Sequence, residues 1–179
     1  MSTLRFNTWQ NTGGTEVANS TLGTGKILQV VSTTKTDTFS TTNTSFTDVT
    51  GLSVTITPSS TSSKIMIVAQ LTHSQDGTFE SMIRLSGGNT SNYVGDAAGN
   101  RVQAVSGVYH YASYRGDYST YNSPLVYLDS PATTSATTYT VQVRCGSGGI
   151  VVVNQSDVDA DTAGNVRGAS TISAWEVSA

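Results

Sequence analysis

The sequence predicts an all-β domain, a sandwich or jelly roll of about nine or ten antiparallel strands. Ser and Thr supply 54 of the 179 residues and only 12% of the residues are charged, a composition that suits pleated, half-buried strands. Short segments alternate between apolar and polar residues, with turn-forming residues between them every 8–15 residues or so. No window of about ten or more residues has helical periodicity. Evenly spaced short strands of this kind are typical of sandwiches and jelly rolls.

Residues 1–25 are expected to form an extended arm, and residues 26–179 the β-sheet head. The arm carries Leu4, Phe6 and Trp9 in a stretch that is otherwise rich in Asn, Thr and Gly. Such a stretch is too polar to build a core of its own. Large apolar side chains on an arm of this kind mark an interaction site, so we expect these three residues to dock the protein to a partner.

Ten segments of the head read as strands. The clearest alternation is at Thr138–Cys145, whereas Lys64–Thr72 and Ile27–Thr33 are apolar on both faces. A two-layer sandwich buries only one face of each strand, so the second face needs cover. A closed cyclic assembly supplies that cover, and we expect a homotrimer. The remaining strands are expected at Thr36–Thr42, Leu52–Thr57, Phe79–Leu85, Val102–Arg115, Leu125–Asp129, Ile150–Val153 and Ser170–Val177.

Composition excludes several classes of function. The net charge is −3 and no basic stripe is present, so binding to nucleic acid or to an anionic membrane has no support. The single cysteine, Cys145, rules out an intrachain disulfide framework. No apolar run approaches the roughly 20 residues that span a bilayer, and the N-terminus lacks the apolar core of a secretory signal. A soluble protein made in a cytoplasm is therefore expected.

No motif predicts an enzyme or a cofactor. His73 and His110 are the two histidines, and neither lies in a recognisable catalytic motif. No Gly-x-Ser-x-Gly elbow is present. Gly23–Lys26 resembles part of a phosphate-binding loop, but Ser20 stands where its first glycine belongs and Ile27 where its hydroxyl belongs. A pair of carboxylates from distant positions stays open as an alternative, because spacing cannot test it.

Two short motifs have a simple structural explanation. Asp157, Asp159 and Asp161 have the spacing with which a calcium loop begins, but Thr162 and Gly168 replace the Gly and Glu that an EF-hand requires. A solvated acidic loop is expected there, with another kind of cation site as the alternative. The tripeptide 115–117 reads Arg-Gly-Asp, the sequence that adhesive ligands present to integrins, and is expected to be a plain turn.

Tyrosines concentrate in the second half of the head. Amphipathic aromatic rings provide large contact area at low entropic cost, in protein interfaces and in sugar sites. We expect alternate tyrosines to fill the sandwich while the rest cover a trimer interface, with a receptor-binding surface as the alternative. The candidate residues are Tyr109, Tyr111, Tyr114, Tyr118 and Tyr121, followed by the strand residue Tyr127.

Three stretches resemble a known family. Residues 4–14, LRFNTWQNTGG, are similar to the lead-in LKVNxxQNTSGG of tail-fibre and other virion proteins of marine and cyanobacterial phages. Residues 25–32, continuing through Phe46–Val49 and Ile56–Pro58 to Ser63–Ile65, resemble the first half of a phage structural domain. Residues 167–172, RGASTI, resemble its last strand. The resemblance implies a trimeric jelly roll like the heads of tumour necrosis factor and C1q, located in a virion assembled in the host cytoplasm.

Two functions follow from this resemblance. The first is a capsid decoration or cement protein, whose trimer clamps the major capsid protein or another virion protein through Leu4, Phe6 and Trp9. The second is a tail-fibre or spike head that binds a host-surface glycan or protein. A fibre needs a shaft, and about 25 residues of arm suit peg-in-socket attachment better, so we favour the cement protein. Phe6 and Trp9 replace the smaller aliphatic residues of the family lead-in, which implies a different docking groove.

Overall fold

The computed structural model describes residues 25–75, 79–109 and 119–179. Within these residues the chain forms ten strands, all paired antiparallel, and one short 3-10 helix. The strands are β1 (Ile27–Lys35), β2 (Phe39–Thr41), β3 (Thr47–Ile56), β4 (Lys64–Gln75), β5 (Glu80–Ser86), β6 (Ser106–Tyr109), β7 (Tyr121–Asp129), β8 (Thr137–Cys145), β9 (Val151–Val153) and β10 (Ser170–Val177); the 3-10 helix η2 is Thr90–Asn92.

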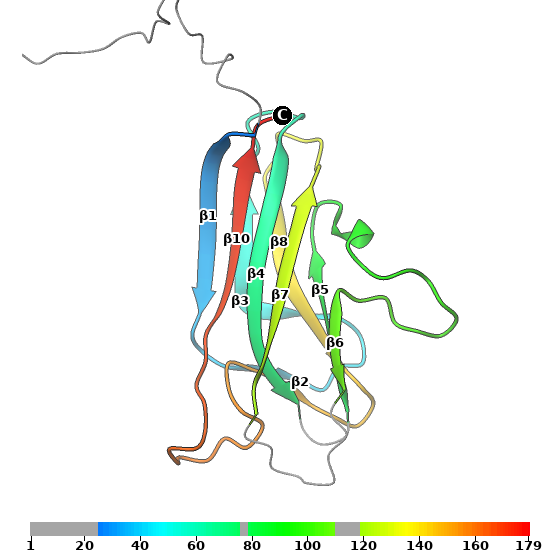
Figure 1. Ribbon diagram of the computed structural model, residues 1–179, viewed down its shortest axis with the longest axis vertical. Coiled ribbons are helices and arrows are strands. Elements are labelled where there is room, and N and C mark those ends of the chain that lie inside the picture. Colours follow the sequence, from blue (N-terminus) through cyan, green and yellow to red (C-terminus); the bar gives the residue numbers. More distant parts are fainter. Residues whose placement is uncertain (1–24, 76–78, 110–118) are drawn as a thin grey trace, which may run out of the picture.

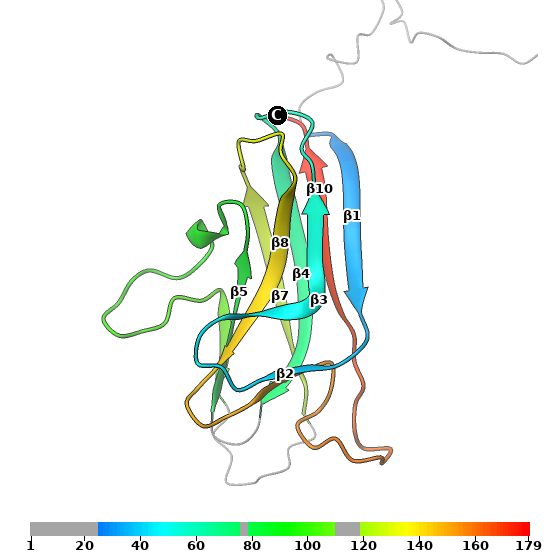
Figure 2. The same ribbon diagram turned by 180° about the vertical axis from the view of Figure 1, so that it is seen from behind.

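The strands form two sheets packed face to face, and their order is that of a jelly roll. The larger sheet runs β1-β10-β4-β7. The short strands β9 and β2 extend it beyond the first residue of β10, because β9 pairs with the last residues of β4. The smaller sheet runs β3-β8-β5-β6. Each sheet joins strands from both halves of the chain, as two Greek keys require. Figures 1 and 2 show the two sheets from opposite sides. The predicted all-β jelly roll is therefore confirmed.

The core lies between the sheets and is built by alternation. On β4, Ile65, Ile67, Ala69 and Leu71 point inward and are at most 2% exposed. The inward residues of β8 are fully buried, and β3 contributes Leu52, Val54 and Ile56 as predicted. Because successive side chains of a strand point to opposite faces, the same alternation fixes which residues lie on the outer faces. The buried β8 residues are Tyr139, Val141, Val143 and Cys145.

The predicted strand at Leu125–Asp129 is longer in the structure. β7 begins at Tyr121 and passes through Pro124, which pairs with Gln70 of β4. A proline inside a strand is unusual because it cannot donate to a ladder. It is tolerated because, among the described strands, β7 pairs only with β4. An edge strand can accept a residue without an N–H.

Two other predicted strands are shorter. The strand expected at Thr36–Thr42 is reduced to β2, because the carbonyls of Lys35 and Asp37 accept hydrogen bonds from the side-chain amide of Asn154. Within the described part of Val102–Arg115, only Ser106–Tyr109 is a strand. The residues before β6 instead bond to a loop: Gln103 donates to the carbonyl of Gly95, whose N–H donates to Ala104.

A buried carboxylate anchors one of the tight turns. Asp129 is fully buried and accepts hydrogen bonds from the Tyr139 hydroxyl at 2.7 Å and from the backbone N–H of Ser130 at 2.8 Å. The turn after β5 passes directly over this pair. A Cβ at Gly88 would lie within 2.9 Å of the Tyr139 hydroxyl and still closer to the Asp129 carboxylate, and Gly88 has φ of +50°. Only glycine fits both the space and the backbone conformation.

A matched pair of substitutions tests this constraint. Gly88→Ala should lower the free energy of unfolding by about 3 kcal/mol or more, because it adds a clash with a buried hydrogen-bonded pair to the cost of positive φ. Gly99→Ala also has positive φ (+58°) but meets nothing within 4 Å, so about 1 kcal/mol is expected. Urea unfolding of both variants measures the difference. Equal effects would show that the packing around Asp129 is unimportant.

Candidate assembly surface

The outer face of the larger sheet carries an apolar row that crosses all four long strands. Register places Val30 of β1 beside Trp175 of β10, Trp175 beside Met66 of β4, and Met66 beside Leu128 of β7. In the next outward row, Val68 of β4 lies beside Val126 of β7. We call these residues the apolar block: Val30, Met66, Val68, Val126, Leu128 and Trp175.

The apolar block is open to solvent in the isolated chain. Val30 and Val126 are each 53% exposed and Leu128 is 42% exposed, whereas Met66 and Trp175 are partly covered by their neighbours. The block occupies the end of the sandwich where β1 and β4 begin and where β7 and β10 end, at the top of Figure 1. Gly25 and the C-terminal residues lie at the same end, so we call it the arm end and the opposite one the loop end.

The loop end of the same face is covered by the chain itself. Thr72 and Ser74 of β4 point outward there, yet they are 7% and 1% exposed. The segment between β9 and β10 crosses over them: the Thr72 hydroxyl donates to the carbonyl of Ala169 at 2.9 Å. A Cβ at Gly168 would lie 2.7 Å from the Thr72 methyl group. The fold therefore provides cover for one part of this face and leaves the apolar block open.

The outer face of the smaller sheet has a different character. Gln142 of β8 donates to the Asp48 carboxylate and accepts from Nε of Arg84, both at 2.7 Å. The Arg84 guanidinium also lies 4.1 Å from the centre of the Phe46 ring. These polar groups are hydrogen-bonded to one another at the surface, although Nε of Arg144 on the same face is buried without a partner among the described residues. Figure 2 shows its strands β3, β8 and β5 from outside.

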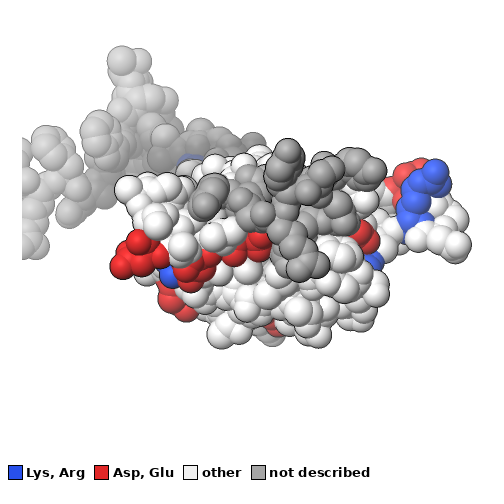
Figure 3. All heavy atoms as spheres, turned by 90° about the horizontal axis from the view of Figure 1, so that it is seen from below, with Lys and Arg blue, Asp and Glu red and all other residues white. Residues whose placement is uncertain are grey.

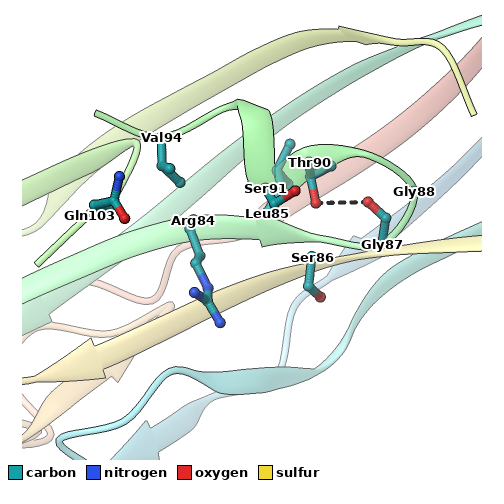
Figure 4. A pocket seen from close by; sticks show the side chains of 9 residues that line it. All are labelled: Arg84, Leu85, Ser86, Gly87, Gly88, Thr90, Ser91, Val94 and Gln103. Carbon is teal, nitrogen blue, oxygen red and sulfur yellow. Dashed lines mark hydrogen bonds between the residues drawn. The ribbon is translucent and has the colours of Figure 1, made fainter. Parts of the chain in front are cut away.

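A hollow of about 330 Å³ lies beside the end of β5. Its described lining residues include no carboxylate, imidazole or thiol. The close-up shows the Arg84 side chain on the opposite side of β5 from Thr90 and Val94 (Figure 4), as expected from its bond to Gln142. The hollow therefore has no acid–base group for catalysis. Its polar side chains are Arg84, Ser86, Thr90, Ser91 and Gln103.

His73 is fully buried between the sheets near the loop end. Its Nε2 lies 3.0 Å from the Ser123 hydroxyl and its Nδ1 lies 3.4 Å from the Ser81 hydroxyl, which in turn donates to Gln75 at 3.1 Å. Burial lowers the pKa of His73 to about 4. The Ser–His contacts are enclosed in the core, where a substrate has no access, so this cluster is part of the packing.

The predicted site residues meet different outcomes. Leu4, Phe6 and Trp9 lie outside the described residues, as do Tyr111, Tyr114, Tyr118 and the Arg-Gly-Asp tripeptide. Tyr109 ends β6 and is 60% exposed, while Tyr121 begins β7 and its ring lies 6.0 Å from that of His73. These two tyrosines belong to edge strands of different sheets. Their predicted role as interface or receptor residues stays a prediction.

The acidic loop is held by its own contacts. Arg167 donates to the Asp159 carboxylate at 2.7 Å, and the Asn165 side chain bonds to the Ala160 carbonyl and to Thr162. Among the described residues, no three His, Cys, Asp or Glu side chains gather in a way that could hold a metal ion. The view from the loop end shows acidic atoms along one side and no run of basic atoms (Figure 3).

The sequence predicts only part of the apolar block. Two-sided apolarity marks β1 and β4, whereas Val126, Leu128 and Trp175 are not among the residues that it predicts for an interface. Alternation of Val126 and Leu128 with Leu125 and Tyr127 is visible in the sequence, but the face that each occupies depends on pairing with β4. In the described part of the chain, no helix has the length and apolar character needed to cross a membrane.

Comparisons with known proteins found a weak structural likeness to viral proteins. No protein-family model and no curated protein matches the chain. A structure of the Gx strain of infectious bursal disease virus is similar at 16% identity and a TM-score of 0.38, over 84% of this chain and 37% of the viral one. The VP2 subviral particle of that virus is similar at 14% identity and a TM-score of 0.34, over 84% and 38%. The chain spans less than two fifths of those proteins.

At these values the likeness supports no argument about function. The assignment as a jelly roll is based on the strand order. Fold and surface together define a jelly-roll domain with one polar outer face and one partly uncovered apolar outer face.

Buried His73 gives a prediction about pH. The pKa of His73 is about 4 in the folded state against 6.5 for the free side chain, so the unfolded chain takes up the proton first. The free energy of unfolding therefore has its full value above pH 6.5 and decreases as the pH falls toward 4, by about 3 kcal/mol in total. His73→Gln should lose this dependence between pH 6.5 and 4.5, as measured by urea unfolding. His110 is present in both proteins, so its contribution cancels when the two pH profiles are compared. Parallel pH profiles for the two proteins would contradict the prediction.

Proposed function

We propose that the chain is a non-enzymatic structural protein of a bacteriophage virion, a homotrimeric capsid decoration or cement protein that stabilises the head. The observation that carries the proposal is the open apolar block on the outer face of the larger sheet of the jelly roll. A lone monomer would leave these side chains in water, and exposed apolar patches of this extent mark interaction sites. The resemblance of residues 4–14, 25–32, 46–49, 56–58, 63–65 and 167–172 to phage virion proteins supports the same function.

A structural role agrees with the chemistry of the described residues. His73 is enclosed in the core, Asp159 is paired with Arg167, and the hollow beside β5 holds no acid–base group. Among these described groups there is no nucleophile with an accessible base, which hydrolytic chemistry would need. The proposed partners are other copies of the chain and the major capsid protein or another virion protein.

In this proposal the arm attaches the trimer to the particle. Leu4, Phe6 and Trp9 would enter sockets between capsid subunits, and aromatic residues in such sockets often dominate the binding energy, at about 2 kcal/mol or more each. Three arms on one trimer add through avidity when the sockets match their spacing. The arm leaves the head beside two backbone hydrogen bonds, one from the N–H of Gly25 to the carbonyl of Ser178 and one from the N–H of Ser178 to the carbonyl of Lys26.

A tail-fibre or spike head is the second candidate. The observation that favours it is the hollow beside β5, which presents hydroxyl and amide groups suited to the hydroxyls of a host-surface glycan. Gold labelling or cryo-electron microscopy of intact particles separates the two functions. Label over the head supports the cement protein; label at the tail or a fibre tip supports the receptor-binding head.

The oligomeric state is the first prediction of this proposal. The purified protein should have three times the 18.7 kDa mass of the chain in light scattering at micromolar concentration. The physical reason is that burying the apolar block lowers the free energy by about 25 cal/mol for each Å² of apolar surface removed from water. A monomeric mass at that concentration would contradict the proposed trimer.

The arm gives a second prediction. A variant that lacks residues 2–20 should fold and form the trimer but should no longer bind particles, because the head keeps its core and loses its anchor. Co-sedimentation with particles that lack the protein measures binding, and light scattering measures assembly. The triple variant Leu4→Ala, Phe6→Ala, Trp9→Ala should behave in the same way. Retained binding, or a truncated protein that dissociates into monomers, would show that the arm has another role.

A further inference from the structure

We infer that the apolar block is the surface through which copies of this chain contact each other, and that this contact places the three arms together at one end of the trimer. The inference rests on the proposed trimeric assembly and deepens it by naming the face and the polarity. It replaces the tyrosine-rich segment, which the sequence favoured, as the main interface.

The chemistry of the block suits contact between identical copies. The outward residues of the two rows are Val30, Trp175, Met66 and Leu128, then Ser32, Ser173, Val68 and Val126. None of them carries a charge. Side chains near a threefold axis lie close to their own copies, so like charges would repel there. An uncharged apolar surface avoids that cost, whereas the outer face of the smaller sheet would bring copies of Arg84 or Asp48 together.

The size of the open surface is also suitable. Four strands about 4.8 Å apart and two outward rows, about four residues at about 3.3 Å each, give roughly 20 Å by 13 Å, about 250 Å² in projection. Contiguous apolar patches of a few hundred Å² on soluble monomers are often functional. Cover by the segment before β10 stops at Thr72, so the open part is one continuous surface that ends at the arm end.

Association through the sheet edge is blocked on one side. The outer edge of β7 would expose backbone groups to pairing, but the Val126 N–H donates to the hydroxyl of Tyr93 at 3.1 Å. The Tyr93 ring stacks on that of Tyr127 at 4.9 Å between centres. A side chain thus occupies the place of an added strand. The outer face of the sheet is therefore the remaining surface through which β7 can contact another copy of the chain.

The position of the block determines the polarity of the assembly. Val30 lies five residues after Gly25, where the arm joins the head, and Trp175 lies three residues before Ser178, which holds Gly25. Copies in contact through this part of the face bring their arm ends together. The acidic loop at Asp157–Asp161 belongs to the loop end and points away. The trimer would then have a three-armed end that faces the particle and a loop end that faces outward.

A charge placed in the block tests the contact. Val126 is half exposed, so Val126→Asp should leave the fold intact and break the interface. We expect light scattering to change from trimer to monomer at micromolar concentration, with an unchanged far-UV circular dichroism spectrum. Thr55→Asp is the matched control: Thr55 is exposed on β3, the edge strand of the other sheet, and its partner Thr138 can donate to the new carboxylate. The control should stay trimeric.

The outcomes separate the two proposals. A wild-type protein that is monomeric overturns the trimer and with it this inference. A trimeric wild type together with a trimeric Val126→Asp overturns the inference alone. For polarity, Leu28→Cys should give cross-linked trimers with a short bismaleimide, and Ala160→Cys in the acidic loop should not. The native Cys145 is buried. Cross-linking at Ala160→Cys but not at Leu28→Cys would overturn the predicted polarity.

Discussion

The larger sheet depends on the pairing of one long strand. β4 pairs with β10 and then β9 along one edge and with β7 along the other. Its inward residues form the centre of the core, and β1 and β2 join the sheet through the strands that β4 holds. Because a strand alternates strictly between two faces, burying Ile65, Ile67 and Leu71 necessarily turns Met66 and Val68 outward. The open apolar block is therefore a consequence of the same register that builds the core.

Buried polar groups fix the connections around this framework. Asn154 is fully buried with φ of +62° and joins the end of β1 to the start of β10 through the carbonyl of Lys35 and the hydroxyl of Ser170. Glu176 is 1% exposed and holds the turn after β3 by accepting from the backbone and hydroxyl of Ser59. Burial opposes its ionisation, but bonds from Ser59, Gln29 and Ser63 outweigh burial and lower its pKa to about 2. Such groups cost several kcal/mol if left unpaired, so each ties a loop to one position.

The contacts of Glu176 give a structural role to two serines of the turn between β3 and β4. Ser59 and Ser63 both donate through their hydroxyls to this buried carboxylate on the last strand. These residues therefore serve the closure of the jelly roll. The proposed functional surfaces, by contrast, are the open block and the arm, which would depend on a partner.

Local patterns in the sequence are enough to predict the fold class and most of the strands. They predict Ser170–Val177 at its observed bounds and mark Lys64–Thr72 as apolar on both faces, because alternation and two-sided apolarity are local properties of the chain. The extension of β7 through Pro124 follows from the fold, since it depends on β7 being an edge strand. Only the tertiary structure decides that Leu128, Met66, Trp175 and Val30 form one row. Those residues are far apart in the sequence, and the register that aligns them is set by packing between strands that the chain brings together only on folding.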